Sequence, residues 1–135
     1  MAKLSAIRAD TKKETEGIWV EYEVGIMLLI ARAGNPKFSK LVTKLSKPHL
    51  KVLRSKNADT SDLFEKITKE ACASTILIGW KNIEEEDGST VKYSAEKALE
   101  YFNDPALHDF YQFVMMSSGD REEYRLEIAE ESAKN

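Results

Sequence analysis

The sequence is poor in the residues from which most catalytic and metal sites are built. It has one cysteine, Cys72, so an intramolecular disulfide is excluded and a reducing cytoplasm suits the chain. Cys72 lies in an apolar run at helical spacing, which predicts a buried structural thiol. The two histidines, His49 and His108, have no metal-ligand spacing, so we interpret both as surface or helix-start residues.

Glycines and long apolar runs are also scarce. The six glycines are scattered and form neither a phosphate-binding loop nor the glycine-flanked serine of a hydrolase. We therefore expect no enzyme activity, no cofactor and no metal. The longest apolar run, residues 25–31, is too short to span a membrane, and residues 1–14 lack the apolar core of a signal peptide.

Length and composition are those of an ordinary soluble domain. The chain has 135 residues, of which 42% are hydrophobic and 32% charged, and this length suffices for a core without disulfides. Its net charge of −3 gives no argument for a nucleic-acid partner. Residues 1–16 are polar and weakly periodic, so we interpret them as a flexible arm, in which Leu4 and Ile7 could hold a short helical turn. Residues 17–135 are interpreted as a single domain.

Residues 17–33 carry the pattern of a β-hairpin. Apolar side chains alternate with others over residues 18–22, and the apolar segment 26–30 follows. The pattern predicts two strands joined near residues 23–25. The second strand is apolar on both faces, so we expect another part of the protein to cover it. A buried helix over residues 19–32 is the alternative.

Helix signals follow the hairpin. Asn35 and Pro36 are a capping residue and a first-turn proline, and they predict a helix that Pro48 interrupts, with a second short helix beyond it. A further helix is expected to run to Ile78 and to end at Gly79. Its expected buried side chains are Leu63, Phe64, Ile67, Ala71, Thr75 and Ile78.

Turns and caps divide the last third of the chain. An acidic turn, residues 84–88, lies between Ile83 and Val91, which could pair as a small hairpin. Further helix starts are predicted at Ser94, Asp104 and Asp120. The last of these helices is expected to pack Tyr124 with Leu126 or Ile128. We therefore predict an α+β fold, mainly α, with four to six helices and a small N-terminal β-hairpin.

A run of cations without intervening acids fills the predicted helices after the hairpin. Its members are Lys37, Lys40, Lys44, Lys47, Lys51, Arg54 and Lys56. Three interpretations stay open: a solvated helix face, a contact with an acidic protein segment, and a nucleic-acid surface. We expect the spacing to spread the cations around a helix, and few aromatic side chains interleave for base stacking. Candidate partner-binding residues in this run are Lys40, Lys44 and Lys51.

Two further regions are candidates for contacts. The aromatic and methionine side chains of residues 101–116 are mostly expected in the core, but Phe113, Met115 and Met116 could form an adaptable groove for an amphipathic partner helix. The acids of residues 84–87 are interpreted as a solvated turn. An acidic segment, residues 120–131, could attract the basic run of another copy, so a homo-oligomer is a further hypothesis.

Four parts of the last third occur in a characteristic order. They are Gly79-Trp80, Asp87-Gly88, the segment 93–98 (Tyr-Ser-Ala-Glu-Lys-Ala), and an aromatic and acidic end around Tyr124 that closes on Lys134-Asn135. In this order and spacing the chain resembles the tail assembly chaperones of long-tailed bacteriophages. Tyr124 stands where the pattern has phenylalanine.

The resemblance implies an assembly factor with no catalytic residues. Such chaperones bind the tape measure protein, keep its long helices soluble and help to recruit tail tube subunits, and they act in the host cytoplasm and are absent from the mature virion. The chain end is similar to the short form of the family, which often has a longer, frameshifted form. The alternative is a small phage nucleic-acid-binding or regulatory protein that uses the basic helix 37–56.

Overall fold

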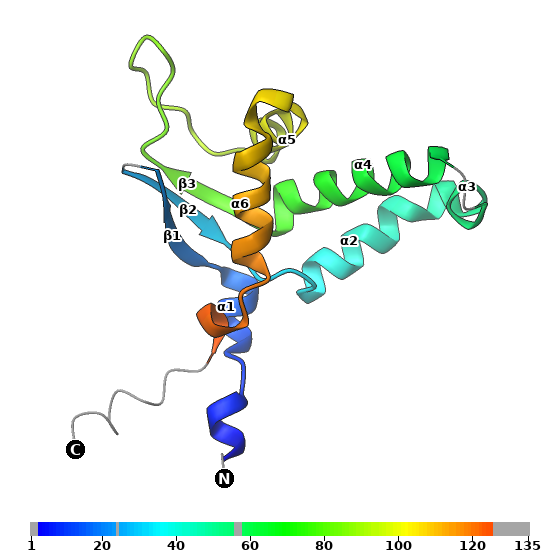
Figure 1. Ribbon diagram of the computed structural model, residues 1–135, viewed down its shortest axis with the longest axis horizontal. Helices are drawn as coiled ribbons and strands as arrows, with labels where there is room; N and C mark the ends of the chain where they lie inside the picture. The colour runs from blue at the N-terminus through cyan, green and yellow to red at the C-terminus, as the bar shows by residue number, and fades with distance from the viewer. Residues whose placement is uncertain (1–2, 24, 56–57, 126–135) are drawn as a thin grey trace.

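A computed structural model describes residues 3–23, 25–55 and 58–125 (Figure 1). It confirms an α+β fold that is mainly α. The strands are β1 (Ile18–Tyr22), β2 (Ile26–Ile30) and β3 (Leu77–Lys81). The α-helices are α1 (Thr11–Glu16), α2 (Pro36–Ser46), α3 (Leu50–Arg54), α4 (Ala58–Thr75), α5 (Ala95–Asn103) and α6 (His108–Ser118). The 3₁₀ turns are η1 (Leu4–Ile7), η2 (Lys47–His49), η3 (Pro105–Leu107) and η4 (Arg121–Tyr124).

The predicted N-terminal hairpin is confirmed. β1 and β2 pair antiparallel, with Ile18 opposite Ile30 and Tyr22 opposite Ile26. The turn between them places Gly25 at a φ of 82°, a conformation that favours glycine. The alternative of a buried helix over residues 19–32 is therefore excluded.

The prediction that a helix runs to Ile78 and ends at Gly79 is wrong. Helix α4 ends at Thr75, and the following residues form β3, which pairs antiparallel with β2 to give the strand order β1-β2-β3. Pairing with β2 satisfies the backbone groups along one edge of this segment, and Leu77 and Trp80 are buried in the core. This pairing and burial outweigh the helical spacing of the apolar side chains, because tertiary packing overrides the weak local preference for a helix.

The core lies between helices α5 and α6 and one face of the sheet, which we call the inner face (Figure 1). Tyr22 of β1 packs its ring against Phe110 and Phe113 of α6, at centroid distances of 5.6 and 4.6 Å. Trp80 of β3 stacks on Tyr101 of α5 at 5.5 Å. Fully buried side chains of this core include Leu28, Ile30, Ile76, Leu77 and Val114.

The two ends of the described chain meet below the sheet. The short turn expected around Leu4 and Ile7 is confirmed as η1, and residues 11–16 form α1, which Asp10 caps by accepting from two backbone N–H groups. The backbone N–H of Asp10 donates to the carbonyl of Tyr124 at 2.7 Å. The N-terminal residues are thus joined by backbone pairing to η4 near the C-terminus.

Helices α2, α3 and α4, with η2, form an extension that we call the helical arm, and Figure 1 shows it projecting away from the sheet. The helix start at Asn35 and Pro36 and the interruption at Pro48 are confirmed. The expected burial of Phe64 is wrong, because 58% of this residue is exposed. Within the arm, α4 packs against α2 and α3, and Phe64 lies on the side of α4 that faces solvent.

Most signals in the last third are confirmed. The acidic turn is closed by the N–H of Val91, which donates to the carbonyl of Ile83 at 2.8 Å. Ser94 caps α5, and Asp104 caps η3, which leads into α6. Asp120 caps a 3₁₀ turn, η4, in which Tyr124 is fully buried. The predicted helix does not continue past this turn, because Arg125 is extended and forms a β-bridge with Ala9. Leu126 and Ile128, which are expected in that helix, lie outside the described residues.

Candidate interaction surfaces

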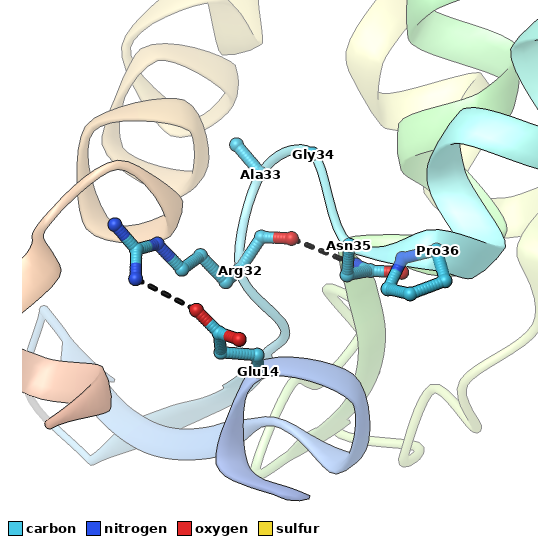
Figure 2. Close-up of a pocket in the computed structure, with 6 residues that line it drawn as sticks. All are labelled: Glu14, Arg32, Ala33, Gly34, Asn35 and Pro36. Carbon is cyan, nitrogen blue, oxygen red and sulfur yellow. Dashed lines mark hydrogen bonds and ion pairs between the residues drawn. The ribbon is translucent and has the colours of Figure 1, made fainter. Parts of the chain in front are cut away.

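The helical arm is fixed to the sheet at a polar junction (Figure 2). The Asn35 side-chain oxygen accepts from the backbone N–H of Phe38 at 3.1 Å and so caps α2. Its Nδ2 donates to the carbonyls of Arg32, at 2.7 Å, and of Thr75, at 3.1 Å. Asn35 is 4% exposed, so a single buried side chain ties the start of α2 to the end of β2 and the end of α4.

An ion pair closes the other side of this junction. Figure 2 shows the guanidinium of Arg32 pointing toward the carboxylate of Glu14, and an Arg32 Nη1 donates to Glu14 Oε2 at 2.7 Å. The backbone N–H of Arg32 also donates to the carbonyl of Glu14, at 2.9 Å. The pocket lined by Glu14, Arg32 and Asn35 therefore has its cation paired within the chain. Its geometry serves to hold α1, β2 and α2 together.

One side of α2 is a stripe of lysines, which corrects the expectation that the cations are spread around a helix. Lys37, Lys40 and Lys44 follow each other at spacings of three and four residues within one continuous helix. Residues at these spacings lie on the same side of a helix. All three are exposed, and the stripe runs for about 10 Å along the helix axis. Lys56, the last cation of the run, lies outside the described residues.

The arm tip adds further cations and exposed apolar side chains to this stripe. Lys47, Lys51 and Arg54 are exposed, and 44% of Leu50 and 41% of Val52 are also exposed. The ion pairs found among the described residues involve none of the six cations of α2, η2 and α3. Two shallow depressions adjoin at the tip and share Pro48 and His49 in their linings. We call the exposed surface of η2 and α3, with the lysine stripe of α2, the arm-tip surface.

Of the three residues predicted to form a groove on α6, two pack in the core and one is exposed. Phe113 packs on Tyr22, and Met115 brings its sulfur to 3.6 Å from the thiol of Cys72, so both side chains belong to the core. Met116 alone of the three projects outward, at 76% exposure. Burial raises the pKa of the Cys72 thiol to about 12. The thiol is thus protonated at neutral pH and contributes packing.

The acidic turn is exposed and hydrogen-bonded within itself. Asp87 Oδ1 accepts from the hydroxyl of Ser89 at 2.6 Å and from its backbone N–H at 2.9 Å. These two bonds lower the pKa of the Asp87 carboxyl. Glu84, Glu85 and Glu86 are exposed. The turn therefore forms a solvated projection.

Two other kinds of site are absent from residues 3–23, 25–55 and 58–125. No group of three histidine, cysteine or acidic side chains there comes together in a way that could hold a metal ion. No described helix has the length and apolar character needed to cross a membrane.

The sequence patterns identified the cations of the arm but missed the buried junction and the tip. The sequence pattern identifies Asn35 as a helix cap. It does not reveal the bond from Asn35 to the Thr75 carbonyl, because these residues lie 40 positions apart. Exposure of Leu50 and Val52 depends on how far the arm projects beyond the sheet, which local spacing does not reveal.

One family model matches the chain. The model described as YdaY prophage protein matches residues 33–135, which include the whole arm, β3 and the helices of the core. No significant match was found among curated proteins or solved structures.

Proposed function

The chain belongs to the YdaY prophage protein family, and we propose that it acts as a tail assembly chaperone of a phage or prophage. In this role it binds the tape measure protein, keeps the long helices of that protein soluble and helps to recruit tail tube subunits. Family membership supports a phage origin. The order of parts in the last third supports the tail assembly role by resemblance.

The observation that carries the proposal is the arm-tip surface. Leu50 and Val52 are exposed beside Lys47, Lys51 and Arg54, on an extension that projects from the sheet. Exposed apolar side chains with a polar rim are typical of protein-binding surfaces. The charge keeps such a surface soluble while its client is absent.

The chemistry of this surface favours an amphipathic helix as the client. Apolar side chains of such a helix can enter the depression that Leu50 and Val52 line, and acidic side chains beside them can pair with the lysines. Because Lys37, Lys40 and Lys44 lie in one stripe, acids at spacings of three and four residues would face them. A tape measure protein, with its long helices, offers such segments repeatedly.

In this role the protein is not a catalyst. It acts by binding, with no cofactor, in the host cytoplasm during assembly, and it is absent from the mature virion. The deeply buried titratable side chains have structural contacts. The Cys72 thiol contacts the sulfur of Met115 in the core, and the Tyr124 hydroxyl donates to the backbone carbonyl of Ile30.

Co-expression with the tape measure protein encoded by the same prophage tests the proposal. We expect the chain to co-purify with that protein and to raise its soluble fraction. The triple variant Lys40→Glu, Lys44→Glu, Lys51→Glu should weaken the complex about tenfold or more, because like charges would then face the acidic client. The charge-matched control is Lys3→Glu, Lys12→Glu, Lys92→Glu, which alters exposed lysines outside the arm. Absence of a soluble complex with either the tape measure or the tail tube protein would contradict the proposal.

The lysine stripe of α2 also supports a second candidate function, a small nucleic-acid-binding or regulatory protein. Cations aligned along one side of a helix can neutralise successive phosphates, and such binding weakens steeply with salt. Retention of the wild-type chain on DNA at low salt, lost in the same triple arm variant and kept in the control, would favour this function. A tail tube gene upstream and a very long tape measure gene downstream would favour the chaperone.

A further inference from the structure

The sheet has a second face, which is turned away from α5 and α6 and which we call the outer face. Side chains of adjacent residues in a strand point to opposite faces. Since Tyr22, Leu28 and Trp80 point into the core, their neighbours point outward. The outward positions are Trp19 and Glu21 of β1, Met27 and Leu29 of β2, and Gly79 and Lys81 of β3.

The outer face is more apolar than a solvent-facing sheet normally is. A strand with one face in water alternates apolar and polar residues, whereas β2 carries Met27 and Leu29 on its outer side. Trp19 lies across this face, and its ring reaches to 3.9 Å from the place where a Cβ on Gly79 would lie. The Lys81 ammonium lies 4.1 Å from the centre of the same ring, and 43% of Trp19 stays exposed.

The charges on the outer face make it self-complementary. Glu21, Met27 and Lys81 are opposite one another in register, so an acid and a base stand on the two edge strands of one row. Two copies can be related by a rotation of 180° about an axis that runs parallel to β2 and lies between the two sheets. This rotation places β1 of one copy over β3 of the other, and each row of paired residues lies over the same row of the partner. Glu21 then faces the partner's Lys81, and both pairs form at once.

From this arrangement we propose that the outer face binds a second copy of this chain, sheet against sheet. Trp19, Met27 and Leu29 of each copy form the apolar centre, and the two Glu21–Lys81 pairs flank it. Sheets that pack in this way keep their strands nearly aligned. Three strands of five residues span only about 15 by 17 Å, so the dimer is weak and reversible. This inference does not rest on the proposed function.

Sedimentation of the full chain over a wide range of concentrations tests the inference. We expect a reversible dimer for the wild type. Glu21→Lys alone and Lys81→Glu alone should each weaken it about tenfold or more, because like charges then face each other twice in the interface. The variants Glu86→Lys and Lys92→Glu change net charge equally at exposed positions outside the outer face, and they should dimerise as the wild type does. Circular dichroism checks that every variant is folded.

An equal mixture of the two outer-face variants gives the sharper result. In this row of the sheet the Glu21→Lys copy carries only bases and the Lys81→Glu copy carries only acids, so both contacts of a mixed pair join opposite charges. We therefore expect the mixture to recover dimers containing one copy of each variant. A wild type that stays monomeric up to its solubility limit overturns the inference. So do single variants that dimerise normally, or a mixture that stays monomeric.

Discussion

Gly17 lies between α1 and β1, where the backbone adopts φ 83° and ψ 168°, a conformation open almost only to glycine. A Cβ at this position would lie 3.2 Å from the backbone carbonyl group of Ile30 and 3.1 Å from the end of the Ile78 side chain. The start of the hairpin therefore depends on the absence of a side chain here.

We predict that Gly17→Ala lowers the free energy of unfolding by about 2–3 kcal/mol, measured by urea denaturation. Gly34→Ala is the control, since Gly34 also has a positive φ, of 80°, but has open space around its Cβ position. Its cost should be confined to the backbone strain, about 1 kcal/mol. Equal losses in the two variants would show that the close approach of Ile30 does not matter.

Buried groups with raised pKa values make the fold sensitive to alkali. Burial raises the pKa values of Cys72 and Tyr93 to about 12, and raises that of Tyr124, whose hydroxyl donates to the Ile30 carbonyl at 2.9 Å. In the unfolded chain a thiol ionises near pH ~8.5 and a phenol near pH ~10. Each group therefore contributes stability that is complete below its unfolded pKa and is lost as the pH rises toward its folded pKa.

We predict that the free energy of unfolding falls as the pH rises above about 8.5, first through Cys72 at about 1.4 kcal/mol per pH unit. Urea denaturation between about pH 7 and about pH 10 measures this slope. Cys72→Ala should be less stable at neutral pH but should show a flat response up to about pH 9.5, where the phenols begin to ionise in the unfolded chain. An unchanged slope in this variant would remove Cys72 as its cause.

At the scale of elements, Asn35 links three of them. Its side-chain oxygen accepts the capping bond of α2, and its amide nitrogen donates to carbonyls at the ends of β2 and α4. Ser94, which caps α5 by accepting from the N–H of Lys97, is exposed and has the capping task alone.

We predict that Asn35→Ala costs about 2–4 kcal/mol, because it removes a cap and the side-chain donor to the Thr75 carbonyl, while the backbone N–H of residue 35 still donates to the Arg32 carbonyl. Asn35→Asp keeps the capping oxygens but loses the donor and faces two carbonyls with a charge, so it should not restore stability. Ser94→Ala should cost only about 1 kcal/mol. Full stability of Asn35→Asp in thermal and urea unfolding would show that the buried donor is dispensable.

Elements that depend on local signals could be predicted, and those that depend on distant pairing could not. The cap at Asn35, the interruption at Pro48 and the hairpin of residues 17–33 follow from neighbouring residues, and all three are confirmed. For strand β3 the sequence pattern predicts the end of α4, because apolar residues at helical spacing continue into it. Its partner, β2, lies about 50 residues earlier in the chain, and no local pattern indicates this pairing.

At the scale of the whole molecule, the chain presents two different surfaces from one core. The arm-tip surface combines cations with exposed apolar side chains, whereas the outer face of the sheet carries one acid and one base around an apolar centre. The sequence showed the cations of the arm, including Lys40, Lys44 and Lys51, because they form an uninterrupted run. It did not show which apolar residues stand beside them, since that depends on the projection of the arm from the sheet.

The central claim is that the arm-tip surface binds the tape measure protein through its exposed apolar residues. The most direct test measures the soluble tape measure protein that co-purifies with the chain after co-expression. We compare the wild type, Leu50→Asp with Val52→Asp, and a control, Leu4→Asp with Ile7→Asp, in which exposed apolar residues of η1 are changed. We predict a soluble complex for the wild type and the control and about tenfold less for the arm variant. An arm variant that keeps the tape measure protein soluble as well as the wild type does would contradict the claim.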